Sequence, residues 1–505
     1  MSSAQDSVEG VELAWLLAGL VAAPRVTVRD LTLDSRSVHA GDAFVALAGR
    51  GSHGLDYLDD AIARGAAAVL WDPAEGRALP PLPPALTTVA VPGLRAELGD
   101  LADRFYGEPS TEAALAGITG TNGKTTCAWL LAQCYGARGA YLGTLGQGRP
   151  PELATGTLTT PDCIALHRAL RRLVDAGARR IALEVSSHAL DQQRVAGACL
   201  PLTAFTNLTR EHLDYHGTMA AYGAAKERLF HCRGVAHAVI NVSDGFGREL
   251  ATRLPAGVAL TRVDAHPATV SPAGGARGVA RFVAATRVMP RAAGLEIEGA
   301  TQHGAFELRS PLVGQFNAEN LLLVLGLLLA GGMPQAEALA ALASASAPPG
   351  RLERFVCGST GPTLVVDYAH TPDALAKALA ALRLHTPGRL WCVFGCGGDR
   401  DPGKRPQMAA AAEAGADALV VTDDNPRTED PERIVAMITA GLAGRVEAHI
   451  ERDRARAIEF AARRARAGDV VLIAGRGHED YQIYGHERRP ASDRALARAL
   501  AEAAR

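Results

Sequence analysis

The segment Gly117-Ile-Thr-Gly-Thr-Asn-Gly-Lys-Thr125 constrains the fold of this chain more than any other feature. It overlaps the end of an apolar run over residues 113–118 and precedes a helix-compatible run over residues 127–135. A glycine-rich turn that leaves a strand and opens a helix directs backbone N–H groups and the positive helix end at one point. The segment therefore predicts a phosphate-binding loop on an α/β sheet, in a protein that binds a nucleoside triphosphate.

The loop departs at one position from the common phosphate-loop pattern. That pattern has glycine five residues before the Gly-Lys pair, where this chain has Ile118, so we expect Gly120 and Gly123 to make the turn. Lys124 would reach the terminal phosphates, and the Thr125 hydroxyl would bind Mg2+. A glycine-rich surface turn with a solvated lysine is the alternative, which the flanking strand and helix disfavour. The residues expected at the nucleotide here are Gly120, Thr121, Asn122, Gly123, Lys124, Thr125 and Thr126.

Length and composition describe a multi-domain globular protein. A chain of 505 residues is too long for one ordinary core, and about three domains are expected. Hydrophobic residues make up 48% and charged residues 21% of the chain. The net charge of −2 and the lack of a basic run argue against nucleic-acid binding.

We expect a cytoplasmic monomer without a membrane span. Residues 1–10 are polar and acidic, unlike a secretory signal, and the longest apolar run, residues 321–330, is too short to cross a bilayer. The eight cysteines are scattered, and even Cys392 and Cys396 lack a common zinc spacing. They are therefore interpreted as buried thiols in a reducing compartment.

Two loop-like segments divide the chain into three predicted domains. These segments are residues 107–111 and residues 346–350, so the domains would cover residues 1–108, 109–347 and 348–505. In the middle domain, residues 181–185, 202–205 and 236–241 resemble buried parallel strands, and residues 263–312 suggest a β-rich extension.

The third domain alternates strands and helices regularly, which predicts a doubly wound parallel sheet. Its expected strands are residues 364–366, 390–394, 418–421, 447–450 and 470–473, and its expected helices include residues 372–384 and 431–442.

Polar side chains follow several of these strands, where ligands of open α/β sheets bind. Glu184 ends a strand and is a candidate Mg2+ contact opposite the phosphate loop; a surface glutamate is the alternative. A histidine-rich segment, residues 206–217, follows the next strand, although His216 could equally be structural. Asn317 and Asn320 suit a base or ribose, or serve as helix caps.

In the third domain, three loops rich in arginine and carboxylates suit a zwitterionic substrate: residues 395–400, 424–427 and 475–479.

This set of motifs closely resembles the Mur ligases, in particular the type that adds the third residue of the peptidoglycan stem peptide. The resemblance covers nearly the whole chain in the same order and spacing. It implies three α/β domains: a UDP-binding N-terminal domain, a central ATPase domain of the P-loop type and a Rossmann-like C-terminal domain. The Asp424-Asn-Pro-Arg427 element resembles the version that selects meso-diaminopimelate.

For the catalytic centre, the resemblance implies that Thr125 and Glu184 bind the Mg2+ that bridges the ATP phosphates. His212 would help to hold a second Mg2+ together with Lys226, which carries a carbamate in the family. A carbamate is an anionic ligand, whereas a bare ammonium would be repelled by two divalent cations. The family usually has aspartate where this chain has Glu211.

The resemblance also implies contacts with each substrate. Positions around the nucleotide are Asn317, Asn320, Arg351, Asp367 and His370. Positions of the UDP module are Leu33, Ser35, Arg36, Arg50, Gly51 and Ser52, next to His53, where relatives often have aspartate. Positions that hold the muramoyl dipeptide are Thr159, Thr160, Ser187, Gln192 and Arg194. Positions of the incoming amino acid are Arg400, Asp424, Asn425, Pro426, Arg427, Gly475 and Glu479.

The implied reaction is ATP-dependent amide-bond formation between UDP-MurNAc-L-Ala-D-Glu and meso-diaminopimelate through an acyl phosphate. Arg427 would give specificity, because its guanidinium suits the distal carboxylate of diaminopimelate and repels the ammonium of lysine. A ligase that resembles folylpolyglutamate synthase is one alternative, and a nucleotide-dependent switch without ligase activity is another. ATP turnover only when both acceptor substrates are present would discriminate against the switch.

Overall fold

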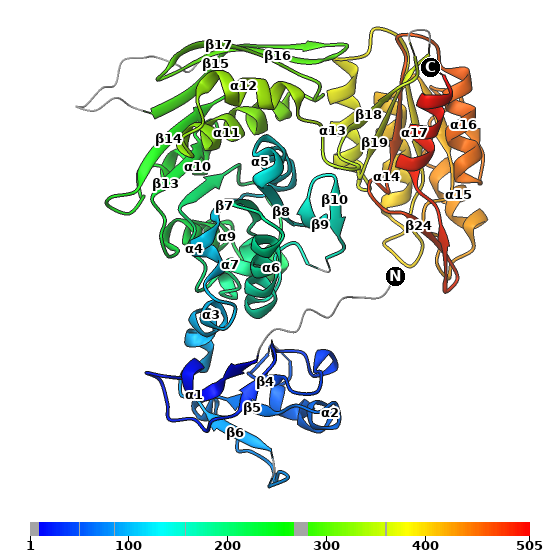
Figure 1. Cartoon of the computed structure of the whole chain (residues 1–505). Coiled ribbons are helices and arrows are strands. Elements are labelled where there is room, and N and C mark those ends of the chain that lie inside the picture. The colour runs from blue at the N-terminus through cyan, green and yellow to red at the C-terminus, as the bar shows by residue number, and fades with distance from the viewer. Residues whose placement is uncertain are drawn as a thin grey trace.

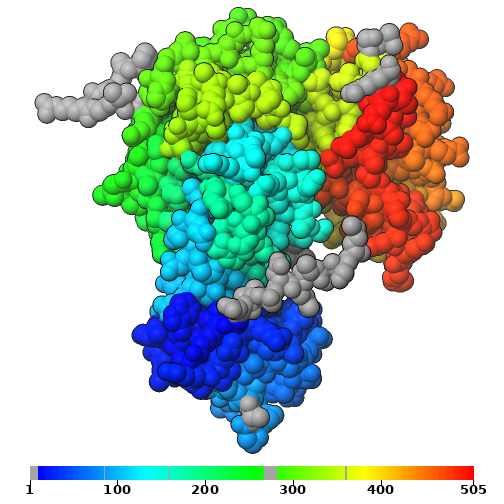
Figure 2. Space-filling view, viewed as in Figure 1, coloured from blue at the N-terminus to red at the C-terminus, as the bar shows by residue number. Residues whose placement is uncertain are grey.

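The computed structural model describes residues 10–49, 51–84, 86–156, 158–266, 281–358 and 361–504. Three α/β sheets follow one another along the chain and form three lobes (Figure 1). The first lobe projects from one end of the middle lobe, and the third lies beside the middle lobe (Figure 2). Each main sheet lies within one of the three predicted ranges, which we retain as the proposed domains. Arg50 lies outside the described residues.

The first lobe has a four-stranded parallel sheet in the order β3-β4-β5-β6. All four residues of its apolar strand β4 are buried, as expected for a strand covered on both faces. Its elements are β1 (Val11–Glu12), α1 (Leu13–Leu16), β2 (Thr27–Val28), β3 (Leu31–Thr32), β4 (Ala43–Ala46), α2 (Leu58–Ala63), β5 (Ala68–Trp71), β6 (Thr87–Ala90) and α3 (Leu94–Phe105).

The first lobe is joined to the middle lobe by direct packing. Helix α3 lies so close to the middle lobe that a Cβ on Gly99 would be 2.5 Å from the Cβ of Ala196. Arg168 of the middle lobe forms an ion pair of 2.9 Å with Asp30 and donates to the Leu31 carbonyl at 2.6 Å. The junction therefore fixes the edge strand β3, which leads into the predicted UDP module.

The middle lobe is built on an eleven-stranded sheet in the order β10-β9-β8-β11-β7-β12-β13-β14-β15-β16-β17. The strands from β8 to β15 in this order are parallel, and antiparallel hairpins extend both edges. The strands are β7 (Ala114–Thr119), β8 (Gly139–Gly143), β9 (Gly146–Arg149), β10 (Glu152–Ala154), β11 (Arg180–Glu184), β12 (Leu202–Phe205), β13 (His237–Asn241), β14 (Ala259–Asp264), β15 (Arg281–Arg291), β16 (Gly294–Thr301) and β17 (Gly304–Ser310). The predicted strands and the β-rich extension are confirmed, except for residues 267–280, which lie outside the described part.

Helices cover both faces of this sheet through separate apolar cores. The helices of the middle lobe are α4 (Pro109–Glu112), α5 (Lys124–Cys134), α6 (Cys163–Asp175), α7 (Ser187–Asp191), α8 (Leu213–His216), α9 (Met219–Glu227), α10 (Gly245–Leu250), α11 (Phe316–Ala330) and α12 (Gln335–Ser344). The apolar run within α11 is a buried helix, as predicted. Among the described residues, no helix is long and apolar enough to cross a membrane.

The third lobe is the predicted doubly wound sheet, in the order β18-β19-β23-β20-β21-β22. Only the edge strand β18 is antiparallel to its neighbour. Its strands are β18 (Glu353–Val356), β19 (Thr363–Asp367), β20 (Leu390–Phe394), β21 (Ala418–Val421), β22 (Ala448–Ile450), β23 (Val470–Ala474), β24 (Tyr481–Tyr484) and β25 (Glu487–Pro490). Its helices are α13 (Pro372–Arg383), α14 (Lys404–Gly415), α15 (Pro431–Thr439), α16 (Arg454–Arg464) and α17 (Asp493–Ala503), which pack in two cores on opposite faces.

A buried ion pair ties α16 to α17. Both Arg454 and Asp493 are at most 3% exposed, and they form two hydrogen bonds of 2.8 Å. We expect Asp493→Ala to lower the free energy of unfolding by about 3 kcal/mol, because the buried Arg454 guanidinium would lose its paired carboxylate and the buried Arg476 would keep only its longer pair with Glu479 among the described residues. Urea unfolding measures the change. Glu487→Ala, which breaks an exposed pair with Arg489, is the control and should change stability by less than about 1 kcal/mol; an equal effect of both variants would contradict this account.

Candidate active site

The phosphate loop connects β7 to α5, and two glycines shape it as predicted. Gly120 has φ +147°, and a Cβ there would lie 1.8 Å from the Thr206 hydroxyl oxygen. Gly123 has φ +85°, and a Cβ there would lie 2.4 Å from Asn320 Oδ1. Because both positions combine a left-handed backbone with close neighbours, only glycine fits them without rearrangement.

The segment after β12 holds this loop from one side. Asn207 accepts from the N–H of Asn122 through its side chain at 2.9 Å and from the N–H of Thr121 through its carbonyl at 2.8 Å. The Thr206 hydroxyl donates to the Asn122 carbonyl at 2.6 Å. The loop is therefore held in shape by protein contacts, and the first turn of α5, with Lys124, Thr125 and Thr126, opens directly from it.

Lys124 lies over the loop that precedes it. Its ammonium donates to the carbonyls of Gly120 at 2.8 Å and Thr121 at 2.9 Å. Burial lowers the pKa of Lys124, and the charge of Glu184 acts in the opposite direction. The cation is thus placed where the loop turns, next to the carboxylate of the neighbouring strand.

Glu184 ends β11 and is fully buried. One carboxylate oxygen accepts from the Tyr141 hydroxyl and from the Thr144 N–H, the latter at 3.0 Å. The other accepts from the Thr125 hydroxyl at 2.9 Å. A hydroxyl and a carboxylate that meet at the phosphate loop are the hard oxygen ligands that Mg2+ prefers, so these residues fit the predicted metal.

Lys226 is a buried amine beside the same loop. It is 1% exposed, and its Nζ donates to the Gly120 carbonyl at 2.7 Å. Burial, and then the charge of Lys124, lower its pKa to about 6. Since a neutral amine is the form that reacts with CO2, the site suits the predicted carbamate. Three of the predicted catalytic residues, Lys124, Glu184 and Lys226, are therefore brought together around one loop.

His212 lies in a cluster of aromatic rings. It is exposed, has φ +55°, and its ring centroid is 5.0 Å from that of His188 and 6.1 Å from that of Tyr222. The Nζ of Lys226 lies 4.4 Å from the centroid of the same tyrosine ring, so the two predicted ligands of the second metal flank Tyr222. Glu211, the position that departs from the family pattern, is exposed, and its Oε2 lies 3.8 Å from the Nε2 of His212.

Four of the predicted dipeptide-binding residues, Thr159, Thr160, Gln192 and Arg194, form one network next to Glu184. The Thr159 hydroxyl lies 3.1 Å from that of Thr144, and the Thr160 hydroxyl donates to the Glu184 carbonyl at 2.8 Å. Arg194 donates to the Thr160 carbonyl at 2.8 Å and to the Gln192 side chain at 3.0 Å. The remaining member, Ser187, lies 3.0 Å from the Nε2 of His216.

The predicted nucleotide contacts come from two lobes. Asn317 and Asn320 lie on α11 of the middle lobe, and Arg351 lies at the start of the third lobe. Asn320 donates to Asn317 at 2.8 Å, and both are buried. The Arg351 guanidinium lies 5.0 Å from the Tyr368 ring centroid, and its charge helps to lower the pKa of Lys124. Its buried Nε has no hydrogen-bond partner among the described residues. Arg351 is therefore available for an anion at the junction of the two lobes.

The other two predicted nucleotide residues differ in exposure. The Asp367 carboxylate accepts from the backbone N–H of Leu352 at 2.8 Å and of Ala369 at 2.9 Å, while burial raises its pKa. His370 is exposed, and its Nδ1 lies 2.9 Å from the Tyr368 carbonyl. Asp367 therefore supports the backbone near Arg351, whereas His370 is open to a ligand.

The strand-end loops of the third lobe meet as predicted. Asn425 donates to Glu479 at 3.0 Å, and a Cβ on Gly475 would lie 2.7 Å from Asp424 Oδ2. Burial raises the pKa of Glu479. The loop residue Pro426 is buried between Asn425 and Arg427.

Arg427 has φ +52° and donates through one Nη to the Gly398 carbonyl at 2.7 Å. Its backbone is held by Ile483, whose carbonyl accepts from the Arg427 N–H at 3.0 Å. A Cβ on Gly397 would lie 2.9 Å from the Arg427 Nη1 and 3.9 Å from the Arg400 Cγ. Two cations, Arg400 and Arg427, and two carboxylates, Asp424 and Glu479, thus lie on neighbouring strand-end loops, which suits a zwitterion.

The predicted UDP-module residues form a separate group in the first lobe. Ser35 is buried, and Leu33 is half-buried. The Arg36 side chain is exposed and forms two hydrogen bonds to Asp34, at 2.9 and 2.8 Å. Gly51 and Ser52 are exposed in the following loop.

His53 stands where relatives often have aspartate, and its side chain has a structural role. Its Nδ1 accepts from the Leu55 N–H at 3.1 Å and caps a short helix, so the proton is on Nε2. That nitrogen lies 2.8 Å from Glu75 Oε2. His53 is 7% exposed, and it shapes the loop rather than facing solvent.

Sequence reasoning missed three residues of the site: Tyr141, Thr144 and Tyr222. Tyr141 and Thr144 lie at the end of β8, a strand that was not predicted because its glycine-rich sequence lacks an apolar run. Tyr222 stands four residues before Lys226, which places both side chains on one face of α9. That spacing is the signal that could have identified Tyr222.

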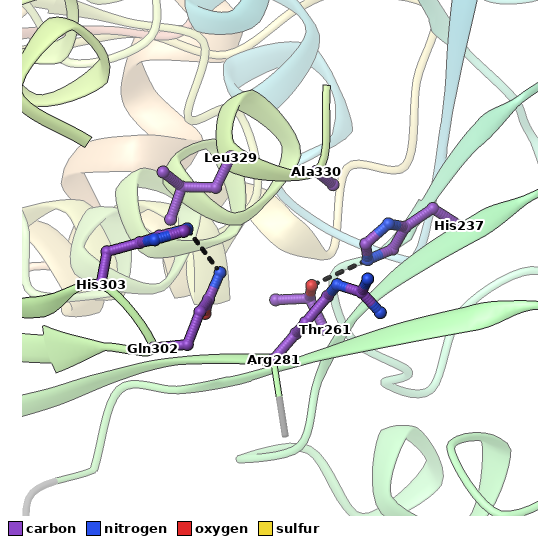
Figure 3. A pocket seen from close by; sticks show the side chains of 7 residues that line it. All are labelled: His237, Thr261, Arg281, Gln302, His303, Leu329 and Ala330. Atoms are coloured by element: carbon purple, nitrogen blue, oxygen red, sulfur yellow. Dashed lines mark hydrogen bonds between the residues drawn. The ribbon is translucent and has the colours of Figure 1, made fainter. Parts of the chain in front are cut away.

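Two cavities lie outside this group. One of about 600 Å³ is lined by His237, Thr261, Arg281, Gln302, His303, Leu329 and Ala330 (Figure 3). His237 begins β13, so this cavity lies at the amino ends of the parallel strands, whereas the phosphate loop follows the carboxyl end of β7. A second cavity of about 720 Å³ lies after β13 and includes Ser243 and Asp264.

Three protein-family models match the chain in sequence order. They are the Mur ligase family catalytic domain over residues 27–106, the Mur ligase middle domain over residues 118–328 and the Mur ligase glutamate ligase domain over residues 350–477. One model falls within each of the three lobes.

Curated relatives and solved structures agree with these models. The chain is 46% identical to the UDP-N-acetylmuramoyl-L-alanyl-D-glutamate–2,6-diaminopimelate ligase of Xylella fastidiosa over 96% of both proteins. It is 48% identical to the ligase of the same name from Pseudomonas aeruginosa, over 92% of this chain and 93% of that protein.

A solved structure of a ligase with this name has a TM-score of 0.72 and 34% identity over 98% of this chain and 99% of that chain. A folylpolyglutamate synthase of Mycobacterium tuberculosis shares the fold, with a TM-score of 0.55, 19% identity and coverage of 79% of this chain and 92% of that chain. With three family models in order and relatives that match from end to end, the chain belongs to the Mur ligase family.

Proposed function

We propose that this protein is an ATP-dependent ligase that joins meso-diaminopimelate to UDP-MurNAc-L-Ala-D-Glu in peptidoglycan precursor synthesis. The observation that carries this proposal is the convergence of Lys124, Glu184 and Lys226 at one phosphate loop. The dipeptide network lies beside it at Thr160, which holds the Glu184 carbonyl. The relatives whose names state this reaction match the chain over more than nine-tenths of its length.

Two Mg2+ sites and a carbamate complete the proposed centre. Thr125 and Glu184 would hold one ion, and His212 with carbamylated Lys226 would hold the other. The ions would supply positive charge at the transferring phosphoryl oxygens. The low pKa of Lys226, about 6, supports carbamylation because it leaves the amine neutral at pH 7.

The chain's own residues then position two successive steps. Lys124 and the loop N–H groups hold the β- and γ-phosphates while the D-Glu γ-carboxylate attacks the γ-phosphorus, which breaks its bond to the bridging oxygen and releases ADP. The amine of diaminopimelate attacks the resulting acyl phosphate, loses a proton, and inorganic phosphate leaves from the tetrahedral intermediate. Because the nucleotide and the amino acid would be bound by different lobes, closure of the third lobe would exclude water from the acyl phosphate.

An isotope experiment tests the acyl phosphate directly. UDP-MurNAc-L-Ala-D-Glu labelled with ¹⁸O in the γ-carboxylate would transfer one labelled oxygen to the released phosphate. We expect mass spectrometry to detect this phosphate only when ATP and meso-diaminopimelate are both present. Unlabelled phosphate together with tripeptide product would contradict the acyl-phosphate route.

Arg427 should determine the choice of amino acid. Its guanidinium uses one donor on Gly398 and has further N–H groups that could bind the distal carboxylate of diaminopimelate. We expect Arg427→Ala to lower kcat/KM for meso-diaminopimelate about 50-fold, through loss of a charge-assisted pair. The KM for ATP should change little. Arg433→Ala, which removes an exposed arginine on α15, is the matched control; an equal loss in both variants would remove Arg427 from the specificity pocket.

A further inference from the structure

Tyr222 is a buried aromatic residue at the centre of the proposed catalytic site. It is 1% exposed and lies on α9, one helical turn before Lys226. Its hydroxyl lies 3.1 Å from the Thr121 hydroxyl of the phosphate loop. Its ring faces the Lys226 Nζ at 4.4 Å and stacks on His216 with centroids 5.1 Å apart and an interplanar angle of 29°. One side chain therefore contacts the phosphate loop and the lysine at the same time.

The direction of the hydrogen bond follows from the other partners of Thr121. The Thr121 hydroxyl donates to the Thr209 carbonyl at 3.3 Å and accepts from the Thr209 N–H at 3.0 Å. A threonine hydroxyl has one proton and two acceptor positions, so with its proton on the Thr209 carbonyl its remaining acceptor position is open to the Tyr222 hydroxyl. The Tyr222 hydroxyl thereby completes the set of bonds that ties the loop to the segment leading to His212.

Lys226 depends on the same support. Its Nζ donates to the Gly120 carbonyl, one residue before Thr121, while the Tyr222 ring lies against it. Tyrosine and lysine four residues apart are neighbours on a helix, so the ring restricts the rotamers of the lysine. His216, which stacks on the same ring, lies 3.0 Å from Ser187, which links this support to the predicted dipeptide site.

We infer that Tyr222 is a positioning residue that sets the phosphate loop through its hydroxyl and holds Lys226 for carbamylation through its ring. This inference rests on the proposed function, because the ligase reaction gives the loop and the lysine their roles. The inference assigns a different effect to each of two parts of the Tyr222 side chain, the hydroxyl and the ring. Removal of the hydroxyl should affect ATP binding, and removal of the ring should affect the carbamate.

Two variants of the full-length protein test the inference, with Tyr135→Phe as the control because the buried Tyr135 hydroxyl has no hydrogen-bond partner among the described residues. We expect Tyr222→Phe to raise the KM for ATP about fivefold to tenfold, as for one lost hydrogen bond, with an unchanged KM for meso-diaminopimelate. Its ¹³C carbamate signal, measured by NMR in ¹³C-bicarbonate, should equal that of the unaltered protein. We expect Tyr222→Leu to lose that signal and to regain part of it at high bicarbonate.

Each outcome decides the question. A KM for ATP in Tyr222→Phe equal to that of the control would overturn the role of the hydroxyl, and a full carbamate signal in Tyr222→Leu would overturn the role of the ring. If Tyr222→Leu does not fold by its melting curve, Tyr222→Met replaces it as the test of the ring, and a full carbamate signal in that variant would overturn the role of the ring. The unaltered protein is measured first: if it lacks ligase activity or the carbamate signal, the proposed function fails instead.

Discussion

Lys124→Ala should lower kcat of the ligase reaction about 10³-fold, which corresponds to about 4 kcal/mol of transition-state stabilisation. Lys124 is the cation that lies on the phosphate loop, with its ammonium between the carbonyls of Gly120 and Thr121. In the transition state, negative charge spreads over the transferring phosphoryl oxygens, and alanine offers neither charge nor a donor there. Steady-state phosphate release measures the loss.

The control for this variant is Lys377→Ala. Lys377 is an exposed lysine on α13 that pairs with Asp373, its neighbour one helical turn away. We expect unchanged kcat and KM in the control and similar melting curves for both variants, because the hydrogen bonds that Lys124→Ala removes go to two carbonyls of the phosphate loop and not to the apolar cores. A Lys124→Ala enzyme with more than about a tenth of normal kcat would contradict the assignment of this loop as the phosphate site.

Lys226→Ala should lower kcat about 100- to 1,000-fold, because the anionic ligand proposed for the second metal would be lost. Lys226→Arg should be equally impaired: it keeps a cation but cannot form the carbamate. Removal of dissolved CO2 should slow the unaltered enzyme and leave Lys226→Ala unaffected. An active Lys226→Arg enzyme would show that the reaction does not need the carbamate.

The same residue predicts a pH dependence. Burial lowers the pKa of Lys226 to about 6, so the amine is neutral above this pH and protonated below it. Only the neutral amine reacts with CO2, and the carbamate fraction and the rate should therefore fall together as the pH decreases through about 6. The ¹³C carbamate signal and kcat, recorded at the same pH values, check this; a signal that persists to pH 5 with no loss would contradict it.

The sequence predicted most of the α/β architecture because parallel strands buried on both faces are apolar runs. The strands β11, β12 and β13 and the doubly wound third sheet were found for this reason. Strand β8 was missed because glycines interrupt its apolar pattern, and the hairpin of β24 and β25 was missed because polar residues occur in both of its short strands. Short strands with glycine or polar residues are therefore the part of this fold that periodicity does not reveal.

In the candidate site, too, local sequence patterns identified some residues, whereas others are brought together only by the tertiary structure. The phosphate loop is contiguous, so spacing alone identified Lys124 and Thr125. Glu184 could be placed because it ends a strand that was predicted. The role of Tyr141 depends on β8 lying beside β11, a pairing that no local pattern specifies. Similarly, the contact of Tyr222 with Thr121 joins residues 101 positions apart.

Phosphate release from Mg-ATP, measured with UDP-MurNAc-L-Ala-D-Glu and either meso-diaminopimelate or L-lysine, tests the central claim most directly. We expect rapid release with meso-diaminopimelate, little with lysine, and almost none when either acceptor substrate is omitted. A preference for lysine would keep the ligase and contradict the role of Arg427. Release that needs neither acceptor, or no release under any condition, would contradict the ligase assignment itself.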